Sequence, residues 1–409
     1  MSFSLKSLQV AVSEHAAFRR RVRLQPVGGP GDKVFPPTYP GEGRNAPPRH
    51  VFEKRRVDGS DIWTVLLDSV QSSANRSEEA LLSLARKGSI ELPYLSVSFE
   101  GTEVPEVGEI TSLDAPHRVF DAILRDSQLD GKPLMKSEVG GELLRANLAH
   151  ATAIFETSPT ALLFGAWNST GEGGGLGAKF PRCFVSEIVG INVPVDDPSK
   201  PDPNSAGRRP GSRIDPLGIL KGVSVYKSDK TTDWDIKQVS KDYKKSKPSE
   251  INHGNIAPSI TDLGVTMEYA EHTTVVSFAA LRRLGFGDTN RDLAARTMLA
   301  ALGLVAHFGQ IKEGYALRSR CDLVFEGATS LQLIRFDGGR DDVPVDYDAA
   351  IKLYHEAVEA ARLAGFKLDK APLLLVPQEK LVNLVKQSRE LALAGKGGEE
   401  QEAAADAGT

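Results

Sequence analysis

The sequence contains little cysteine and no long apolar run. Only Cys183 and Cys321 occur among its 409 residues, which excludes a disulfide framework and a zinc site built from cysteine thiolates. No apolar run approaches the ~18 residues of a membrane span. The N-terminal residues also lack the apolar segment and the small-residue cleavage site of a secretory signal. We therefore expect a soluble cytoplasmic protein with two buried, reduced thiols.

Patterns for metal and acid–base chemistry are also missing. The eight histidines are scattered, and no two of them have the H-x-x-x-H spacing of a zinc site. The carboxylates show no spacing that indicates an acid–base dyad. There is no Gly-Lys-Ser/Thr sequence to form a phosphate-binding P-loop. These patterns indicate no catalytic residue, no metal and no cofactor.

The charge is uneven along the chain. The formal net charge is −4, and four acidic residues near the C-terminus account for all of it: Glu399, Glu400, Glu402 and Asp406. The remainder is neutral but holds basic clusters at residues 19–23 and 54–56. A third cluster places five lysines within residues 237–247. Such clusters form either solvated faces or binding surfaces for an anionic partner such as nucleic acid.

A glycine-rich stretch occupies the middle of the sequence. Residues 161–164 are apolar and predict a short buried strand, and residues 165–177 then contain six glycines. Lys179 and Arg182 follow, before a second apolar run at residues 184–193 that predicts another strand. Glycine leaves backbone N–H groups bare and allows another backbone to approach closely. With two cations at its exit, this loop indicates an anionic partner, most simply a phosphate.

A polar turn precedes a clear helix. Residues 62–67 are apolar, and residues 70–86 carry helical periodicity. Between the two runs, residues 68–76 hold small polar side chains and one arginine at the predicted helix start. The serines and the asparagine either cap the helix or present hydroxyls, amides and helix N–H groups to a phosphate.

Apolar patterns predict further elements along the chain. Helices are expected from about residue 116 to 124 and at residues 142–155, 289–308 and 379–393, and Gly309 stands just past the end of the third. Residues 315–325 and 331–336 are predicted to be the two strands of a hairpin, and residues 373–376 to be a short last strand.

The order of predicted elements indicates the fold class. Strands and helices are mixed without a regular alternation, which favours an α+β fold over a doubly wound sheet. Residues 196–258 are rich in proline and polar side chains, and only residues 214–226 within them could pair as a strand. We interpret 196–258 as a flexible insertion projecting from a core made of residues 1–195 and 259–395. The acidic residues 396–409 are predicted to be a disordered tail.

Three classes of function remain open from the residues alone. Residues 173–178 satisfy the dinucleotide pattern G-x-G-x-x-A, so a nucleotide-binding enzyme is one alternative, although Pro181 and a strand follow where a helix should begin. A structural or scaffolding role is another. Nucleic-acid binding uses more of the chain, because two candidate anion-binding turns and several basic clusters suit a groove that follows a phosphate backbone. Trp167, Phe180 and Tyr39 could stack on bases.

Four segments together resemble a known family. They read RLQPVGGPGDKVFPPTYP, LLDSVQSSANRSEEAL, TSLDAPHRVFDAIL and SPTALLFGAWNSTGEGGGLGAKFPRCFVSEIVGIN. They are similar to the Cas-seven-type backbone subunit of the type I-G (formerly I-U) CRISPR effector complex, one of the RAMP proteins. The similarity runs from Arg19 to Phe336. It implies a modified RRM-like (ferredoxin-like) palm with large insertions, one of which acts as a thumb.

The resemblance also implies function and site residues. Copies of the subunit would assemble head to tail along one crRNA guide, together with other effector subunits, and present the guide to target DNA. A separate helicase-nuclease would cut, and no residue here matches the loop aspartate with which RNA-targeting relatives cleave. The thumb is expected within residues 196–258. The expected RNA-binding residues are Ser69, Gln71, Ser72, Asn75 and Arg76 at the helix start, Trp167, Asn168, Lys179 and Arg182 on the glycine-loop side, and His117 and Arg118, which could instead serve a contact between subunits.

Overall fold

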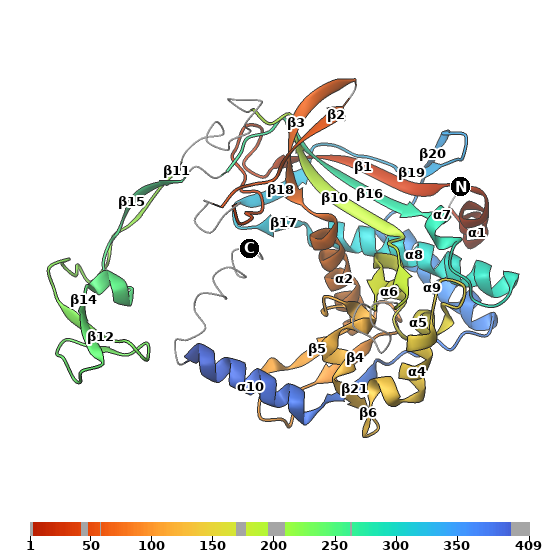
Figure 1. Ribbon diagram of the computed structural model, residues 1–409. Coiled ribbons are helices and arrows are strands. Elements are labelled where there is room, and N and C mark those ends of the chain that lie inside the picture. The colour runs from red at the N-terminus through yellow and green to blue at the C-terminus, as the bar shows by residue number, and fades with distance from the viewer. Residues whose placement is uncertain are drawn as a thin grey trace.

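A nine-stranded antiparallel sheet forms the centre of the fold (Figure 1). The computed structural model describes residues 3–41, 48–57, 59–168, 177–194, 209–261 and 264–393. The main path of the sheet runs through β17 (Tyr315–Arg318), β18 (Cys321–Phe325), β1 (Ala17–Pro26), β16 (Tyr269–Ser277), β10 (Phe184–Ile191), β3 (Ser60–Asp68) and β2 (Phe52–Val57). Beside it, β19 (Leu331–Ile334) pairs with β1 and with β20 (Arg340–Val343).

Two helices cover one face of this sheet. They are α2 (Val70–Arg86) and α8 (Thr289–Glu313). Alternate β1 side chains such as Phe18 and Val22 are buried on the helical side, as the period of two in a strand requires. Within α8, Gly303 allows close packing against Val276 of β16. The β1 residues between the buried ones therefore lie on the opposite, open face.

The order of elements agrees with the predicted α+β class. Read along the chain, β1, α2, β10, β16, α8 and β18 follow a β-α-β-β-α-β sequence, and four of the strands lie side by side as β18-β1-β16-β10. This order is consistent with a ferredoxin-like, and hence RRM-like, palm. The hairpin of β2 and β3 is an addition between β1 and α2.

A second, smaller sheet lies at the other end of the core. It has the order β5 (Glu109–Thr111), β4 (Leu95–Ser98), β21 (Leu373–Pro377), β6 (Ser127–Leu129) and β7 (Lys132–Pro133). One continuous apolar cluster joins it to α8 and to α9 (Tyr347–Leu363). Tyr354 of α9 is fully buried, and its hydroxyl donates to the carbonyl oxygen of Glu91 at 2.8 Å. The predicted last strand and last helix are confirmed as β21 and α10 (Glu379–Leu393).

An arm of strands projects from the core, at the left of Figure 1. We use the name arm for residues 209–261. Its base is a two-stranded ribbon of β11 (Arg209–Arg213) and β15 (Ile256–Thr261). The ribbon leads to a small sheet of β13 (Trp234–Asp235), β12 (Val225–Ser228) and β14 (Tyr243–Ser246). The expectation that only residues 214–226 could pair is therefore wrong, because paired strands continue through the lysine cluster.

Removing the outer arm should leave the core folded. Arg213 and Ile256 are opposed in the ribbon, so a two-residue Asn-Gly turn can replace residues 214–255 and close it as a hairpin. Most large apolar side chains of this segment are exposed, including Ile214 and Leu217. We expect a melting temperature within about 3 °C of the intact chain, corresponding to about 1 kcal/mol, measured by circular dichroism. If the shortened chain is unfolded or aggregates, residues 214–255 are part of the core.

Two predicted elements near the glycine-rich stretch are wrong. The strand predicted for residues 161–164 belongs to helix α6 (Pro159–Phe164), which is buried throughout. Proline at the first helical position presets the backbone for a helix, and a four-residue apolar run fits a buried helix as well as a strand. The single helix predicted for residues 142–155 is two, α4 (Glu138–Arg145) and α5 (Thr152–Thr157), separated by a bridge between Asn147 and His150.

Two further predictions fail near the C-terminal half of the main sheet. The helix predicted for residues 289–308 begins after its cap Asp288 and continues through Gly309 to the end of α8. Gly309 does not stop this helix. It lies on the side of α8 that faces α2, where an added side-chain carbon would lie 3.5 Å from Ala80, an ordinary van der Waals distance. The hairpin predicted between residues 315–325 and 331–336 is also wrong. Instead β17 and β18 form the hairpin, turning at Arg320 with φ of 62°.

Candidate nucleic-acid interface

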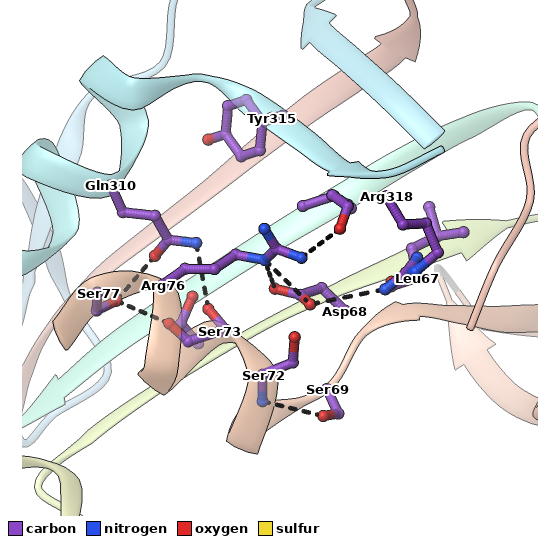
Figure 2. Close-up of polar contacts among 12 residues, drawn as sticks. Leu67, Asp68, Ser69, Ser72, Ser73, Arg76, Ser77, Gln310, Tyr315 and Arg318 are labelled. Carbon is purple, nitrogen blue, oxygen red and sulfur yellow. Dashed lines mark hydrogen bonds and ion pairs between the residues drawn. The ribbon is translucent and has the colours of Figure 1, made fainter. Parts of the chain in front are cut away.

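The start of α2 uses part of its polar turn to cap the helix. Ser69 is the N-cap residue, and its hydroxyl accepts a hydrogen bond from the backbone N–H of Ser72 at 3.2 Å (Figure 2). Such a cap satisfies one of the helix's free N–H groups. Gln71 and Asn75 lie one turn apart on the exposed side of α2. Of the predicted helix-start residues, these two present their amides to solvent.

Arg76 is engaged within the fold. Its Nε lies 3.4 Å from the buried carboxylate of Asp68, and its guanidinium also donates to the carbonyl oxygen of Leu317 at 2.5 Å (Figure 2). Burial raises the pKa of Asp68, while Arg76, Ser72 and Arg318 oppose this rise. An unpaired carboxylate at this depth would be costly. Arg76 therefore stabilises the junction of β3 with α2, and we leave it out of the interface proposed below.

A polar ladder fixes α2 against α8. The hydroxyl of Ser77 donates to Oε1 of Gln310 at 2.9 Å, and Nε2 of Gln310 lies 3.5 Å from the hydroxyl of Ser73. All three side chains are buried, and Figure 2 shows them in line beside Arg76. Buried polar groups that satisfy one another specify a unique packing. The orientation of the exposed face of α2 is thereby set.

Arg118 joins three of the segments that carry the sequence resemblance. It begins a single 3-10 turn (Arg118–Phe120), where a helix starting near residue 116 is predicted, and its φ is 52°. Its guanidinium donates to both carboxylate oxygens of Glu78 in α2, each at 2.7 Å, and to the carbonyl oxygen of Gly165 at 3.0 Å. Arg118 is 8% exposed and Glu78 1%. We call this arrangement the Arg118 node.

The Arg118 node affects the charge state of Glu78. Burial raises the pKa of Glu78 to about 7, and the bidentate contact with Arg118 opposes the rise. A paired geometry of this kind favours the ionised carboxylate. Arg118, expected to contact RNA or a neighbouring subunit, is thus occupied within the fold. Glu78 was not among the residues singled out by the sequence, where it is one of many helical glutamates.

A short hairpin follows the node. Its strands are β8 (Ala166–Trp167) and β9 (Lys179–Phe180), with Trp167 opposite Lys179. Nζ of Lys179 lies 4.1 Å from the centre of the Trp167 ring, a cation–π contact, and Trp167 is 46% exposed. The backbone N–H of Asn168 donates to the carbonyl oxygen of Ala178 at 3.3 Å. Phe180 is buried, so it packs and does not stack on a base.

Glycine is required on both sides of this hairpin. Gly165 has φ of 86°, a conformation that other residues rarely adopt. At Gly177, a side-chain carbon would lie 1.9 Å from the carbonyl oxygen of Asn168. Residues 169–176 lie outside the described residues, and with them most of the proposed nucleotide-binding pattern at 171–178.

Two more predicted residues flank the node. Arg182 is exposed, and its pKa is lowered first by partial burial and then by the charge of Arg118. His117 is exposed, and its backbone N–H donates to the carboxylate of Asp121 at 3.0 Å. We use the name palm face for the exposed predicted residues on these three segments: Gln71, Asn75, His117, Trp167, Lys179 and Arg182. It offers amides, cations and one aromatic ring, all suited to a nucleic-acid backbone and its bases.

Comparison with known protein families finds a match over the part of the chain that holds this site. Residues 18–195 match the family model described as CRISPR-associated protein GSU0053. The match supports a CRISPR-associated protein. It spans β1, α2, the Arg118 node and the hairpin, and ends beyond β10. No curated protein sequence matches the chain.

Further titratable side chains lie in the interior of the described core. His272 is fully buried, with Nε2 2.7 Å from the hydroxyl of Ser186 and Nδ1 2.9 Å from that of Tyr315. Burial lowers the pKa of His272 to about 3, so the ring is neutral and links β10, β16 and β17. Burial also raises the pKa of the Cys183 thiol to about 12. Within the described ranges, no group of His, Cys, Asp or Glu side chains could hold a metal, and no helix is long and apolar enough to cross a membrane.

Proposed function

We propose that the chain is a non-catalytic, crRNA-binding backbone subunit of a type I CRISPR interference complex, of the I-G type that it resembles. Copies bind one guide RNA in head-to-tail order and present it for hybridisation with target DNA, in association with other effector subunits. The observation that carries the proposal is the Arg118 node, because it joins α2, the 118–120 turn and the start of the hairpin. All three belong to the region matched by the CRISPR-associated family.

The palm face has the chemistry for a guide of any sequence. Trp167 offers a ring on which a base stacks, and every base has such a face. Lys179 and Arg182 are exposed cations for phosphates, and the amides of Gln71 and Asn75 can bond to 2′-hydroxyls. In these contacts none of the groups binds a base edge. Contacts to backbone and ring faces fit a subunit that must accept every spacer.

The filament and the thumb complete the proposal. A head-to-tail contact that does not close generates an open assembly whose length follows its template. The arm is the element best shaped to serve as the thumb, because it extends away from the core on a two-stranded ribbon. Its lysines, including Lys241 and Lys245, are exposed and suit contact with a nucleic-acid strand.

Purification without nuclease tests this function. We expect an ultraviolet spectrum dominated by nucleic acid and a high, heterogeneous mass by light scattering, both collapsing on RNase treatment. DNase treatment is the matched control and should leave the mass unchanged. If the chain is reconstituted with guide RNA and the other effector subunits and still forms no RNase-sensitive assembly, the proposed function is wrong. A nucleotide titration would then test the glycine-loop enzyme.

A further inference from the structure

A groove crosses the open face of the main sheet, on the side away from α2 and α8. Its volume is about 670 Å³, and residues of β1, β16, β19, β20 and the connection before β19 line it. Four arginines take part: Arg19, Arg21, Arg23 and Arg340. We call it the arginine groove. It contains none of the residues of the palm face.

Three of the four arginines form no ion pair among the described residues, although three carboxylates also line the groove. Among the described residues of the groove, only Arg21 forms an ion pair. Its Nη2 donates to the two carboxylate oxygens of Glu271 at 2.7 and 2.6 Å. Arg23 stacks over the ring of Tyr269, with 4.1 Å from its guanidinium carbon to the ring centre. Among the described residues, neither Arg23 nor Arg340 forms an ion pair. Glu326 and Asp342 also line the groove but pair with none of its arginines.

Arg19 is the most constrained of the four. Its Nη2 donates to the neutral amide oxygen of Gln332 at 3.0 Å, while its buried Nε has no hydrogen-bond partner within the described chain. Burial lowers the pKa of Arg19, and the neighbouring charges of Arg340 and Arg21 lower it further. The charges of Arg340 and Arg21 are therefore both repulsive toward the Arg19 guanidinium. An anion between them would relieve this repulsion and provide the missing acceptor.

The spacing of the cations favours a strand of phosphates over a single ion. Arg19, Arg21 and Arg23 are alternate residues of β1, so successive side chains on this face are about 6.8 Å apart. That is close to the separation of successive phosphates in an extended single strand. Planar guanidinium groups also match phosphate oxygens in pairs.

We propose that the arginine groove binds the phosphate backbone of a single nucleic-acid strand that is not paired with the guide, while the palm face holds the guide RNA. This inference rests on the proposed function, because it assigns a second strand to the same complex. Hybridisation of a guide with duplex DNA leaves one strand displaced. The groove offers that strand a sequence-independent path on the opposite face of the sheet.

A two-strand binding assay tests the groove. The protein is loaded with guide RNA, and a labelled oligothymidylate with no complementarity is titrated by fluorescence anisotropy. The variant Arg23→Gln with Arg340→Gln should bind oligothymidylate at least about 10-fold more weakly, with a log–log salt slope shallower by about 1.4, since each lost phosphate contact removes about 0.7. Guide-RNA affinity should change less than about twofold. The control Arg335→Gln removes an exposed arginine that is already paired with Asp341 and should change neither.

Each alternative result overturns the inference. If the double variant binds oligothymidylate as tightly as the wild type, the groove is not the binding site. If the Arg335→Gln control loses as much affinity as the double variant, the loss reflects the net charge of the protein and not the groove. If the double variant loses affinity for guide RNA by the same factor as for oligothymidylate, the groove belongs to the guide-binding site. Displacement of the DNA by oligoglutamate at the same charge concentration would indicate an acidic protein partner. If the wild type fails to load guide RNA, the proposed function fails, but loss of oligothymidylate binding by the free variant still tests the groove.

Discussion

Replacing Arg118 with leucine should lower the free energy of unfolding by about 3–5 kcal/mol, the usual cost of removing one partner from a buried ion pair. The substitution leaves the carboxylate of Glu78 buried without its two hydrogen bonds and removes the donor to the Gly165 carbonyl. Urea denaturation followed by tryptophan fluorescence measures the loss. The exposed pair of Arg86 with Glu109 is a matched control, and Arg86→Leu should cost less than about 1 kcal/mol.

The same variant should show a defined dependence on pH. The pKa of Glu78 is raised by burial to about 7 from an ordinary value of 4.5, and loss of Arg118 removes the main opposing charge. A raised pKa contributes stability that is present below the ordinary value and lost as pH rises through the folded value. Arg118→Leu should therefore be less defective near about pH 5 than near about pH 8. An equal deficit at both would exclude Glu78 as the cause, and Glu78→Gln in the Arg118→Leu background should remove the dependence.

Removing the aromatic and cationic pair of the hairpin should weaken guide-RNA binding by about 30-fold or more. Loss of one stacked base costs about 1–3 kcal/mol, and loss of the Lys179 cation removes a phosphate contact as well. Both side chains are exposed and contact each other, so Trp167→Ala with Lys179→Ala should leave the melting temperature nearly unchanged. Fluorescence anisotropy with labelled guide RNA, over a range of salt, gives both the affinity and the number of phosphates lost.

The arm supplies a control of the same composition. Trp234 and Lys237 are an exposed tryptophan and lysine of the arm, and Trp234→Ala with Lys237→Ala should leave guide-RNA affinity within about twofold. If the hairpin variant binds as tightly as the wild type, the palm face does not hold the guide. A similar loss in both variants would place guide binding on the arm as well.

The sequence predicts those elements whose apolar pattern is long and regular. α2 and α10 are found at their predicted bounds, because over about four turns only a helix places their apolar residues on one face. Short runs do not carry this information. Residues 161–164 are apolar on every side and fit either a helix or a strand, and the choice depends on Ser158 and Pro159 at the start of α6. Local patterns predict even less well which strands pair with each other, as the hairpin of β17 with β18 shows.

The candidate site, too, could be predicted from the sequence only in part. Residue type and position identified two of the three segments that meet at the node, and the family resemblance identified the segment with Arg118, but neither showed which side chains remain free. Helical periodicity separates Asn75, on the exposed stripe, from Arg76 beside the buried Ser73 and Ser77. The partner of Arg76 is a carboxylate at the end of β3, and that of Arg118 lies in α2, 40 residues earlier in the chain. Such pairs follow from tertiary packing, which no local pattern encodes.

The position of β1 in the sheet has a consequence for synthesis of the protein. Its partners β16, β18 and β19 all lie beyond residue 268, so at about 5–20 residues per second β1 waits roughly 10–50 s for a neighbour. An unpaired apolar strand invites association with other nascent chains. The four arginines at positions 19, 20, 21 and 23 give this strand a repulsive charge throughout the wait. Arg19, Arg21 and Arg23 line a groove in the finished molecule, and we expect all four arginines to oppose association of the emerging chain.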